Sequence, residues 1–332
     1  MPGAMTEKFG KYVVLRQVGS GGFGSVFEAR DPVIERAVAI KTCHVQDEEV
    51  RARFLQEARL AGNLHHRNLT TIYDIGAEGD VLYLVCEFLP GEDLDAFIER
   101  QDLPLIEKVE ILIGVAYGLS HAHDQGVIHR DIKPSNIRIL PDQTVKIMDF
   151  GIAKSMYAER TLTRAGRTLG TAAYLAPEQI RGEPIDRRAD VYSFGVLAYE
   201  LLSSRKPFTG ASPAAVLESI AEKQVLSLAK AAPDVPGPLA QIVDKAMRKN
   251  PADRYPSIDP VRRDLIAVRE ELLGAASVLP SPSPAEHGAS EKSGAERLHA
   301  RRRNRSPLPA ILVALGIAGL LLVWWWLTHA GR

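Results

Sequence analysis

The sequence predicts an α+β fold of two lobes, a small strand-rich lobe followed by a larger helical lobe. Short β-branched runs punctuated by Gly and Pro fill residues 12–42. After Gly91 most of the chain has the apolar spacing of helices. Near residue 273 the composition shifts to Pro, Ser, Ala and charge, and an apolar run follows. We therefore expect two lobes with a cleft between them, then a linker and a separate apolar segment.

The composition is that of a globular protein without a charge bias. The 332 residues include 41 Lys and Arg and 41 Asp and Glu, so the formal net charge is zero and nothing indicates nucleic acid as a partner. Cys43 and Cys86 are too few for a disulfide framework and favour a reducing compartment. The first twelve residues contain no apolar core of a secretory signal, so we expect no cleaved leader.

The individual elements follow from local patterns. Strands are expected at YVVLRQV, SVFEARD, RAVAIKTC and VLYLVCEFL, and a helix over residues 48–64, where apolar residues lie on or near one face. Apolar spacing predicts further helices over residues 105–125, 186–203, 213–224, 237–247 and 257–272.

A glycine-rich stretch joins the first two strands. Gly19, Gly21, Gly24 and Val26 form the pattern G-x-G-x-x-G-x-V. A dinucleotide-binding turn uses the same glycine spacing but opens a helix, whereas a strand follows here. A glycine loop between strands can lie over a triphosphate with its backbone N–H groups near the oxygens. An ordinary glycine-rich hairpin is the alternative.

A lysine ends the third strand, in VAIK. The ammonium of Lys41 can hold the α- and β-phosphates of a nucleotide, provided that an acidic partner fixes it. Glu57 on the following helix is the candidate partner. The alternatives are a solvent-facing lysine, and a glutamate that is exposed or paired with Arg51 or Arg53.

The stretch HRDIKPSNIRILPDQTVKIMDFG gathers the polar residues of a phosphoryl-transfer site. Asn136 and Asp149 supply oxygen ligands that suit Mg²⁺ bridging phosphates. Asp131 would accept the proton of a hydroxyl that attacks the γ-phosphorus. Lys133 would neutralise charge that develops on the phosphoryl group. A charged surface loop is the alternative, but chance gives a poor account of these residue types in this order.

These motifs resemble, in this order, those of eukaryotic-like (Hanks-type) protein kinases, and specifically of bacterial membrane-anchored serine/threonine kinases. The resemblance covers residues 9–272 and implies a bilobal kinase fold, with an N-lobe of about 9–88 and a C-lobe of about 89–272. It implies transfer of the ATP γ-phosphate, with Mg²⁺ or Mn²⁺, to Ser/Thr hydroxyls of proteins. Lys133, within DIKPSN, resembles serine/threonine rather than tyrosine kinases.

The resemblance also assigns roles to single residues. Lys41 pairs with Glu57, Asp131 is the catalytic base, and Asn136 and Asp149 bind the metal. The residues implied at ATP are Val18, Gly19, Ser20, Gly21, Gly22, Phe23, Gly24, Val26, Ala39, Lys41, Glu87 and Leu89, with Cys86 behind the adenine and main-chain groups of 87–89 binding it.

One residue departs from the family pattern. Arg138 occupies the position of an apolar residue that usually forms the floor of the adenine pocket. Strand alternation places Ile137 and Ile139 on the other face. Because arginine can lay its stem or its planar guanidinium under a purine, we expect altered nucleotide affinity and not loss of binding.

The stretch GTAAYLAPE at 170–178 resembles the end of the kinase activation segment. The resemblance implies that Thr171 approaches Asp131, that Glu178 pairs with Arg254, and that Asp190 anchors the catalytic loop from the helix beneath it. Two histidine clusters, at 64–68 and 121–124, could suggest metal sites, but we expect structural or surface histidines. His121 and His123 are two positions apart on a predicted helix and do not share a face.

The loop after the DFG motif contains Thr161, Thr163 and Thr168. Arg130 is expected to be an unpaired cation beside the base, and Lys154 could join it. A phosphothreonine would bind both cations through charge-assisted hydrogen bonds. We therefore expect autophosphorylation, at Thr163 first and otherwise at Thr161 or Thr168. The alternative is that these threonines are only exposed loop residues.

The apolar run at 308–327 is long enough, as a helix, to cross a hydrocarbon core. We expect a C-terminal transmembrane helix there, a disordered basic juxtamembrane linker at 273–307, and a short extracytoplasmic tail at 328–332. Four arginines at 301–305 mark the cytoplasmic side, so the expected location is the cell membrane, single-pass, with the kinase domain cytoplasmic. A nucleic-acid patch is the alternative for these arginines.

Two other functions compete with a membrane-anchored kinase. A pseudokinase scaffold at the membrane would lack part of the catalytic set, whereas Lys41, Asp131, Asn136 and Asp149 are all present. A small-molecule phosphotransferase would lack the stretch GTAAYLAPE, which in kinases builds a peptide-binding surface. The expected partners are ATP, proteins with Ser/Thr and membrane lipid around the C-terminal helix. A homodimer for trans-autophosphorylation is compatible with this arrangement.

Overall fold

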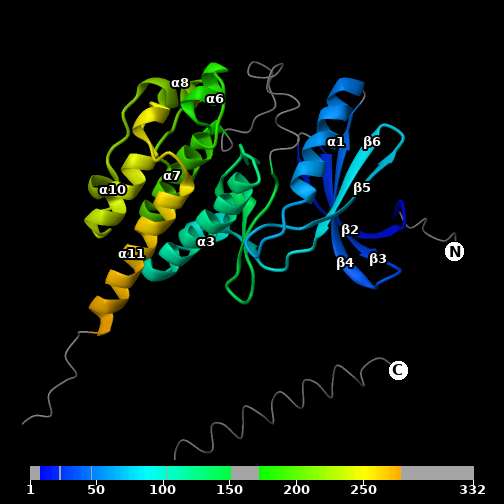
Figure 1. The fold of residues 1–332 in the computed structure, drawn as a ribbon, viewed down its shortest axis with the longest axis horizontal. Helices are drawn as coiled ribbons and strands as arrows, with labels where there is room; N and C mark the ends of the chain where they lie inside the picture. The colour runs from blue at the N-terminus through cyan, green and yellow to red at the C-terminus, as the bar shows by residue number, and fades with distance from the viewer. Residues whose placement is uncertain (1–7, 22–23, 46, 102, 151–171, 278–332) are drawn as a thin grey trace, which may run out of the picture. The chain divides into compact units, whose positions relative to one another are not determined.

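The computed structural model describes residues 8–21, 24–45, 47–101, 103–150 and 172–277. A six-stranded sheet and one long helix come first in this part of the chain, and a group of helices follows, as Figure 1 shows. The described residues all belong to one compact unit. The predicted α+β fold, a strand-rich lobe followed by a helical lobe, is confirmed.

The first lobe is built on six antiparallel strands in the order β1-β2-β3-β4-β6-β5. They are β1 (Lys8–Phe9), β2 (Tyr12–Gly21), β3 (Gly24–Asp31), β4 (Arg36–His44), β5 (Ile72–Glu78) and β6 (Val81–Glu87). Ala29, Val38 and Ile40 are fully buried in a small core on this sheet. The sequence predicted β2, β3, β4 and β6 but not β5, whose buried and exposed residues do not alternate regularly.

Helix α1 (Glu48–Gly62) begins at a well-formed cap. Oδ1 of Asp47 accepts hydrogen bonds from the backbone N–H groups of Glu49 (3.0 Å) and Val50 (3.3 Å). Such a cap stabilises a helix by about 1 kcal/mol. The helix buries Phe54 and Ala58 in the main hydrophobic core, and this packing fixes the position of Glu57, the residue before Ala58.

The second lobe is helical. Its elements are α2 (Leu94–Arg100), α3 (Leu105–Asp124), α6 (Pro177–Arg181), α7 (Arg188–Ser203), α8 (Pro213–Glu222), α9 (Leu228–Ala231), α10 (Gly237–Ala246) and α11 (Ile258–Ser277), with short 3₁₀ turns at Pro134–Asn136 and Pro251–Asp253. Helix α7 is buried from Ala189 to Leu202, so it is the centre of this lobe. Helix α11 runs to Ser277 and therefore includes the first five residues of the predicted linker.

A second, three-stranded sheet carries the loops of the site. Its strands are β7 (Glu92–Asp93), β8 (Ile137–Ile139) and β9 (Val145–Ile147), in the order β7-β8-β9. Ile137 and Ile139 are buried and Arg138 is only partly buried, as the predicted alternation requires. Leu69 forms an isolated bridge to Ile147, which connects this sheet to the segment after α1.

Among the described residues, no helix is both long enough and apolar enough to cross a membrane. The expected span at 308–327 lies outside the described residues. The same is true of linker residues 278–307, of the tail at 328–332, and of the loop at 151–171 with its three threonines.

Candidate active site

The catalytic loop, residues 129–136, is fixed from below by Asp190 of α7. The fully buried carboxylate of Asp190 accepts hydrogen bonds from the backbone N–H of His129 (2.7 Å) and of Arg130 (2.8 Å). His123 of α3 places Nε2 2.9 Å from the same carboxylate. Burial raises the pKa of Asp190, but the contacts with His123 and His129 outweigh it and the pKa is lowered. The carboxylate is therefore charged at neutral pH and holds the loop as predicted for this residue.

Asp131, Lys133 and Asn136 come together in this loop. The side-chain amide of Asn136 donates to the backbone carbonyl of Asp131 (2.8 Å) and to its Oδ2 (3.0 Å). Nζ of Lys133 lies 3.3 Å from the same Oδ2. The carboxylate that would accept the hydroxyl proton is thus oriented by an amide on one side and an ammonium on the other.

Asp149 enters the site from the strand that follows. The backbone N–H of Met148 donates to the carbonyl of Asn136 (2.8 Å), and Nε2 of His129 lies 2.9 Å from the carbonyl of Met148. The ring of Phe150 packs against that of His129 with centroids 4.8 Å apart. Asp149 itself has φ 57°, a left-handed conformation that is uncommon outside glycine. These contacts place Met148, the residue before Asp149, next to Asn136.

The structure corrects the expected ion pair between Lys41 and Glu57. Lys41 contacts the carboxylate of Asp149, and Glu57 instead places Oε1 3.7 Å from Nη1 of Arg130. Arg130 is therefore not the unpaired cation that the sequence suggested. The reason is geometric: the spacing of residues identifies which charges gather at the site, but not which side-chain conformations they adopt.

A small cavity adjoins this second pair. It has a volume of about 110 Å³ and is lined by Glu57, Leu60 and Ala61 of α1 and by Arg130 and Phe150 from the other side. Both charged side chains are about one-third exposed or less, at 36% for Arg130 and 27% for Glu57. The pair of Glu57 with Arg130 therefore lies at a hollow and not in a packed contact, which leaves room for either side chain to turn.

The nucleotide-covering loop is a β-hairpin. Strands β2 and β3 pair Gly19 with Val26 and Gly21 with Gly24. Gly24 has φ 153°, and a Cβ atom there would meet the carbonyl oxygen of Thr42 at 1.7 Å, so only glycine fits. Val18 and Ser20 lie on β2 next to these glycines, whereas Gly22 and Phe23, at the tip, lie outside the described residues.

The connection between the lobes contains a contact that the sequence did not predict. Lys146 of β9 is buried, and its Nζ donates to Oε2 of Glu87 (2.8 Å) and to the carbonyl of Leu69 (3.2 Å). The same Glu87 oxygen accepts from the backbone N–H of Thr71 (3.3 Å). On the neighbouring strands β4 and β6, Ala39 pairs with Cys86, the residue before Glu87. A lysine within an otherwise apolar strand was the one signal that could have indicated this contact.

The segment after the loop at 151–171 is anchored in the helical lobe. Arg254 binds Glu178 in a two-pronged pair, with Nη1–Oε1 2.6 Å and Nη2–Oε2 2.7 Å, and the arginine side chain is completely buried. Oγ of Ser193 donates to the carbonyl of Tyr174 (2.8 Å). Glu178 therefore has the partner that the sequence suggested, whereas Thr171 lies outside the described residues.

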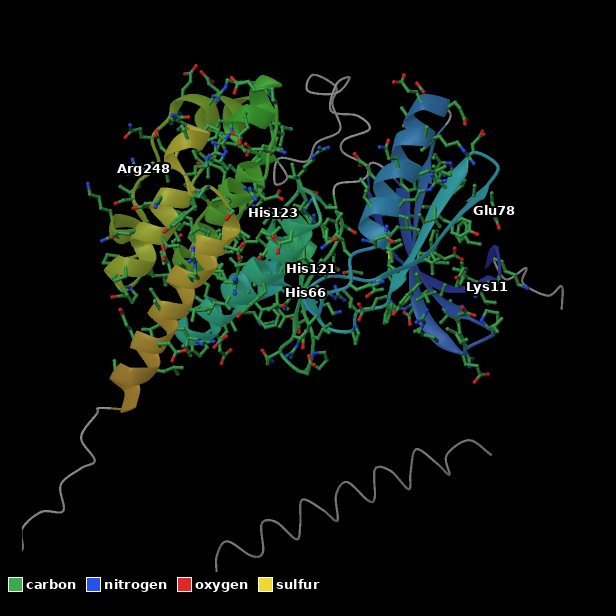
Figure 2. All side chains as sticks on the ribbon, viewed as in Figure 1. Lys11, His66, Glu78, His121, His123 and Arg248 are labelled. Atoms are coloured by element: carbon green, nitrogen blue, oxygen red, sulfur yellow. The ribbon has the colours of Figure 1, made fainter. Side chains whose placement is uncertain are left out.

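Three histidines lie around α3, where Figure 2 labels them. The ring of His66 stacks on that of His121, with centroids 5.0 Å apart, while His123 is bound to Asp190. Burial, followed by the neighbouring charges of His121 and Lys146, lowers the pKa of His66. The sequence treated His123 as one of a structural cluster and missed its support of the catalytic loop.

The residues present fit a divalent cation that arrives with nucleotide. Within the described ranges there is no group of three or more His, Cys, Asp and Glu residues that could hold a metal ion. Asn136 uses its amide nitrogen toward Asp131, so its amide oxygen is the atom that could bind a cation together with the carboxylate of Asp149. Two hard oxygen donors, with phosphate and water supplying the others, are what Mg²⁺ prefers.

This fold and site define a two-lobed phosphotransferase, and the comparisons with known proteins agree. Residues 12–264 match the family model described as protein kinase domain. The chain is 39% identical over 282 residues to the serine/threonine-protein kinase PknL of Mycobacterium tuberculosis, a match that covers 83% of this chain and 70% of PknL. It is 35% identical to the serine/threonine-protein kinase PrkC of Bacillus subtilis, over 77% of this chain and 40% of PrkC.

A solved structure gives the same result. The PknI kinase domain of Mycobacterium tuberculosis superposes with a TM-score of 0.65 at 26% identity, covering 80% of this chain and 98% of that one. The chain belongs to the protein kinase family. Its activity is that of a serine/threonine protein kinase, as the sequence predicted.

Proposed function

We propose that this kinase transfers the γ-phosphate of ATP, bound with a divalent cation, to Ser/Thr hydroxyls of proteins while tethered to the cytoplasmic face of a membrane. The observation that carries the catalytic part is the position of Asp131. Its carboxylate is bound by the amide of Asn136 at 3.0 Å and lies 3.3 Å from Nζ of Lys133. A base held in this way needs no reorientation when a substrate hydroxyl arrives.

The proposed steps use the residues of this loop in turn. Asp131 orients the substrate hydroxyl and accepts its proton as the hydroxyl oxygen bonds to the γ-phosphorus, while the bond from that phosphorus to the β,γ-bridging oxygen breaks and ADP leaves. Lys133, beside it, stabilises the negative charge on the transferring group. Asn136 and Asp149 would hold the cation, which supplies charge neutralisation between the phosphates when bound. Lys41 would move from Asp149 to the phosphates, because the carboxylate of Asp149 and the phosphates are alternative anionic partners for its ammonium.

The direct experiment is transfer from labelled ATP. The purified full chain is incubated with γ-labelled ATP, Mg²⁺ and a general protein substrate, and the labelled product is hydrolysed to its phosphoamino acids. We expect phosphoserine and phosphothreonine, and a loss of at least about 100-fold in Asp131→Asn, which removes the base but keeps its size. Absence of label in the wild type, or equal label in Asp131→Asn, contradicts the proposed mechanism.

We further propose that the kinase is activated by autophosphorylation in the loop at 151–171. The support is the position of Arg130, which follows the catalytic loop's His129 and binds Glu57 at 3.7 Å. Nε of Arg130 is buried and has no hydrogen-bond partner within the described part of the chain. A phosphothreonine, with Thr163 the first candidate and Thr161 or Thr168 next, would supply acceptors to this guanidinium. Glu57 would then be released toward Lys41.

Tethering is supported by the sequence of the apolar run. Residues 308–327 contain no charged side chain and follow four arginines within 301–305. In this orientation the catalytic lobes would face cytosolic ATP, and two chains held in one membrane could phosphorylate each other.

A further inference from the structure

Arg138 is held in place by contacts on both sides of its guanidinium. Its Nε donates to the backbone carbonyl of Leu89 (3.1 Å), and its Nη1 donates to Oδ1 of Asp93 (2.8 Å). Arg138 and Asp93 are also directly opposite each other on strands β8 and β7. All donors of a guanidinium lie in its plane, so these bonds fix the plane and leave its faces open for packing.

The contact with Asp93 replaces an ordinary helix cap. Asp93 is the residue immediately before α2, with extended backbone angles, and an aspartate at such a position usually accepts from the first turn of its helix. Here the side chain makes no such bond and binds Arg138 instead. The carboxylate of Asp93 therefore binds Arg138 and does not cap α2.

The pair lies at the connection between the lobes, where the proposed use of ATP places the base. Leu89 follows β6 and belongs to this connection, and Arg138 spans from the carbonyl of Leu89 to the carboxylate of Asp93. Its side chain is 27% exposed, and that of Asp93 39%.

We propose that Arg138 is a specificity-determining residue for the nucleotide, whose guanidinium, held by Leu89 and Asp93, packs its face against the base. A planar cation attracts an aromatic base more strongly than an aliphatic side chain of the same size does. Asp93 neutralises the charge of Arg138 through Oδ1, so its other oxygen remains for a donor on the sugar. The inference rests on the proposed use of ATP by this chain.

Phosphate recognition by Arg138 is the main alternative. Under that alternative the charge of the guanidinium matters, because it would attract the triphosphate from a distance. Under our proposal its planar shape matters, and the phosphates do not. The two alternatives therefore differ for adenosine, which has the base and sugar but no phosphate.

The test measures dissociation constants of the purified full chain for ATP and for adenosine by calorimetry. Arg138→Lys keeps the charge and removes the planar group, and we expect both constants to rise by a common factor of about five to ten. Arg100→Lys is the matched control, because Arg100 of α2 forms the adjacent pair with Glu92, and we expect no change there. A thermal unfolding scan shows whether each variant is folded.

Two results would overturn the inference. The first is unchanged adenosine binding in a folded Arg138→Lys, which would mean that Arg138 only stabilises the connection between the lobes. The second is unchanged adenosine binding in Asp93→Asn. This variant holds Arg138 less firmly, so the dissociation constant for adenosine should rise about two- to fourfold. Wild-type protein that binds neither ATP nor adenosine would contradict the proposed function itself, and is thereby distinguished from both results.

Discussion

Arg130 lies 3.7 Å from Glu57, measured from Nη1 to Oε1, while Lys41 contacts Asp149. These two cations and two anions form a neutral set in which each charge has a partner. Exchanging partners would keep the set neutral, so the arrangement with Lys41 on Glu57 differs from this one in geometry and not in charge. Because the pair of Arg130 with Glu57 is partly exposed, it contributes only about 0–1 kcal/mol. A phosphate, with up to two charges, is the stronger partner for Arg130.

The first prediction concerns Arg130→Gln. If phosphate on the loop acts by taking Arg130 from Glu57, this variant cannot respond to phosphorylation. We compare kcat/KM of the autophosphorylated protein with that of the phosphatase-treated protein. The ratio should fall from its wild-type value to about one in Arg130→Gln, and likewise in Thr163→Ala, because either change removes one member of the new ion pair.

The control for this experiment is Arg188→Gln, since the side chain of Arg188 forms a partly exposed pair with Asp186. Its ratio should equal that of the wild type. A wild-type ratio in Arg130→Gln would show that activation does not pass through Arg130.

The sequence alone was sufficient to predict the long helices and strands and to identify the residues that gather at the site. Helices α1, α3 and α7 are long, and the catalytic loop is contiguous in sequence. Strands β7 to β9 have only two or three residues, too few to show a period. Contacts between distant residues were also missed: Lys146 binds Glu87 across 59 positions, and His123 binds Asp190 across 67.

The partner of Lys41 is a failure of a different kind. All four charges of that set were identified from sequence, but several pairings satisfy them equally well. Side-chain conformation selects among the pairings, and no residue pattern encodes it.

The second prediction concerns the buried pair of Glu178 and Arg254. Nη1, Nη2 and Nε of Arg254 also donate to the carbonyls of Arg188, Lys249 and Arg248, so the cation is fully bonded. Glu178→Gln leaves that cation buried without a counter-charge. We expect a loss of about 3–5 kcal/mol in the free energy of unfolding, measured with urea. Glu183→Gln, which breaks the exposed pair with Arg181, is the control and should behave as the wild type. Equal stability of Glu178→Gln would contradict the prediction.

The third prediction concerns the apolar run at 308–327. Deletion of this run should move the protein from the membrane fraction to the soluble fraction in a flotation gradient, because about twenty apolar residues suffice for a span. Transfer to a soluble peptide should persist, since the match to the protein kinase family model ends at residue 264. Deletion of residues 328–332 is the control and should leave the protein with the membrane. Wild-type protein in the soluble fraction would refute the tether.

The fourth prediction concerns Glu200, a buried carboxyl group of α7. Its side chain is 7% exposed, with Nζ of Lys206 3.9 Å away, and it accepts a hydrogen bond from the hydroxyl of Tyr174. Burial raises the pKa of Glu200 above the ordinary value of 4.5, although Tyr174 and Lys206 act against it. Between these two pKa values the folded protein binds a proton that the unfolded chain has lost. The stability contribution of Glu200 is therefore present at low pH and falls as pH rises through the folded pKa.

Glu200→Gln removes this titration, because an amide stays neutral while it can still accept from Tyr174. We expect the free energy of unfolding of the variant, relative to wild type, to increase as pH rises above the ordinary pKa of 4.5 and through the raised pKa of the folded state. Urea titrations at several pH values measure the difference. Glu218→Gln, at an exposed position of α8, controls for the loss of one charge, and its difference from the wild type should stay nearly constant. A constant difference for Glu200→Gln as well would mean that Glu200 is charged at every pH tested, with Lys206 compensating its burial.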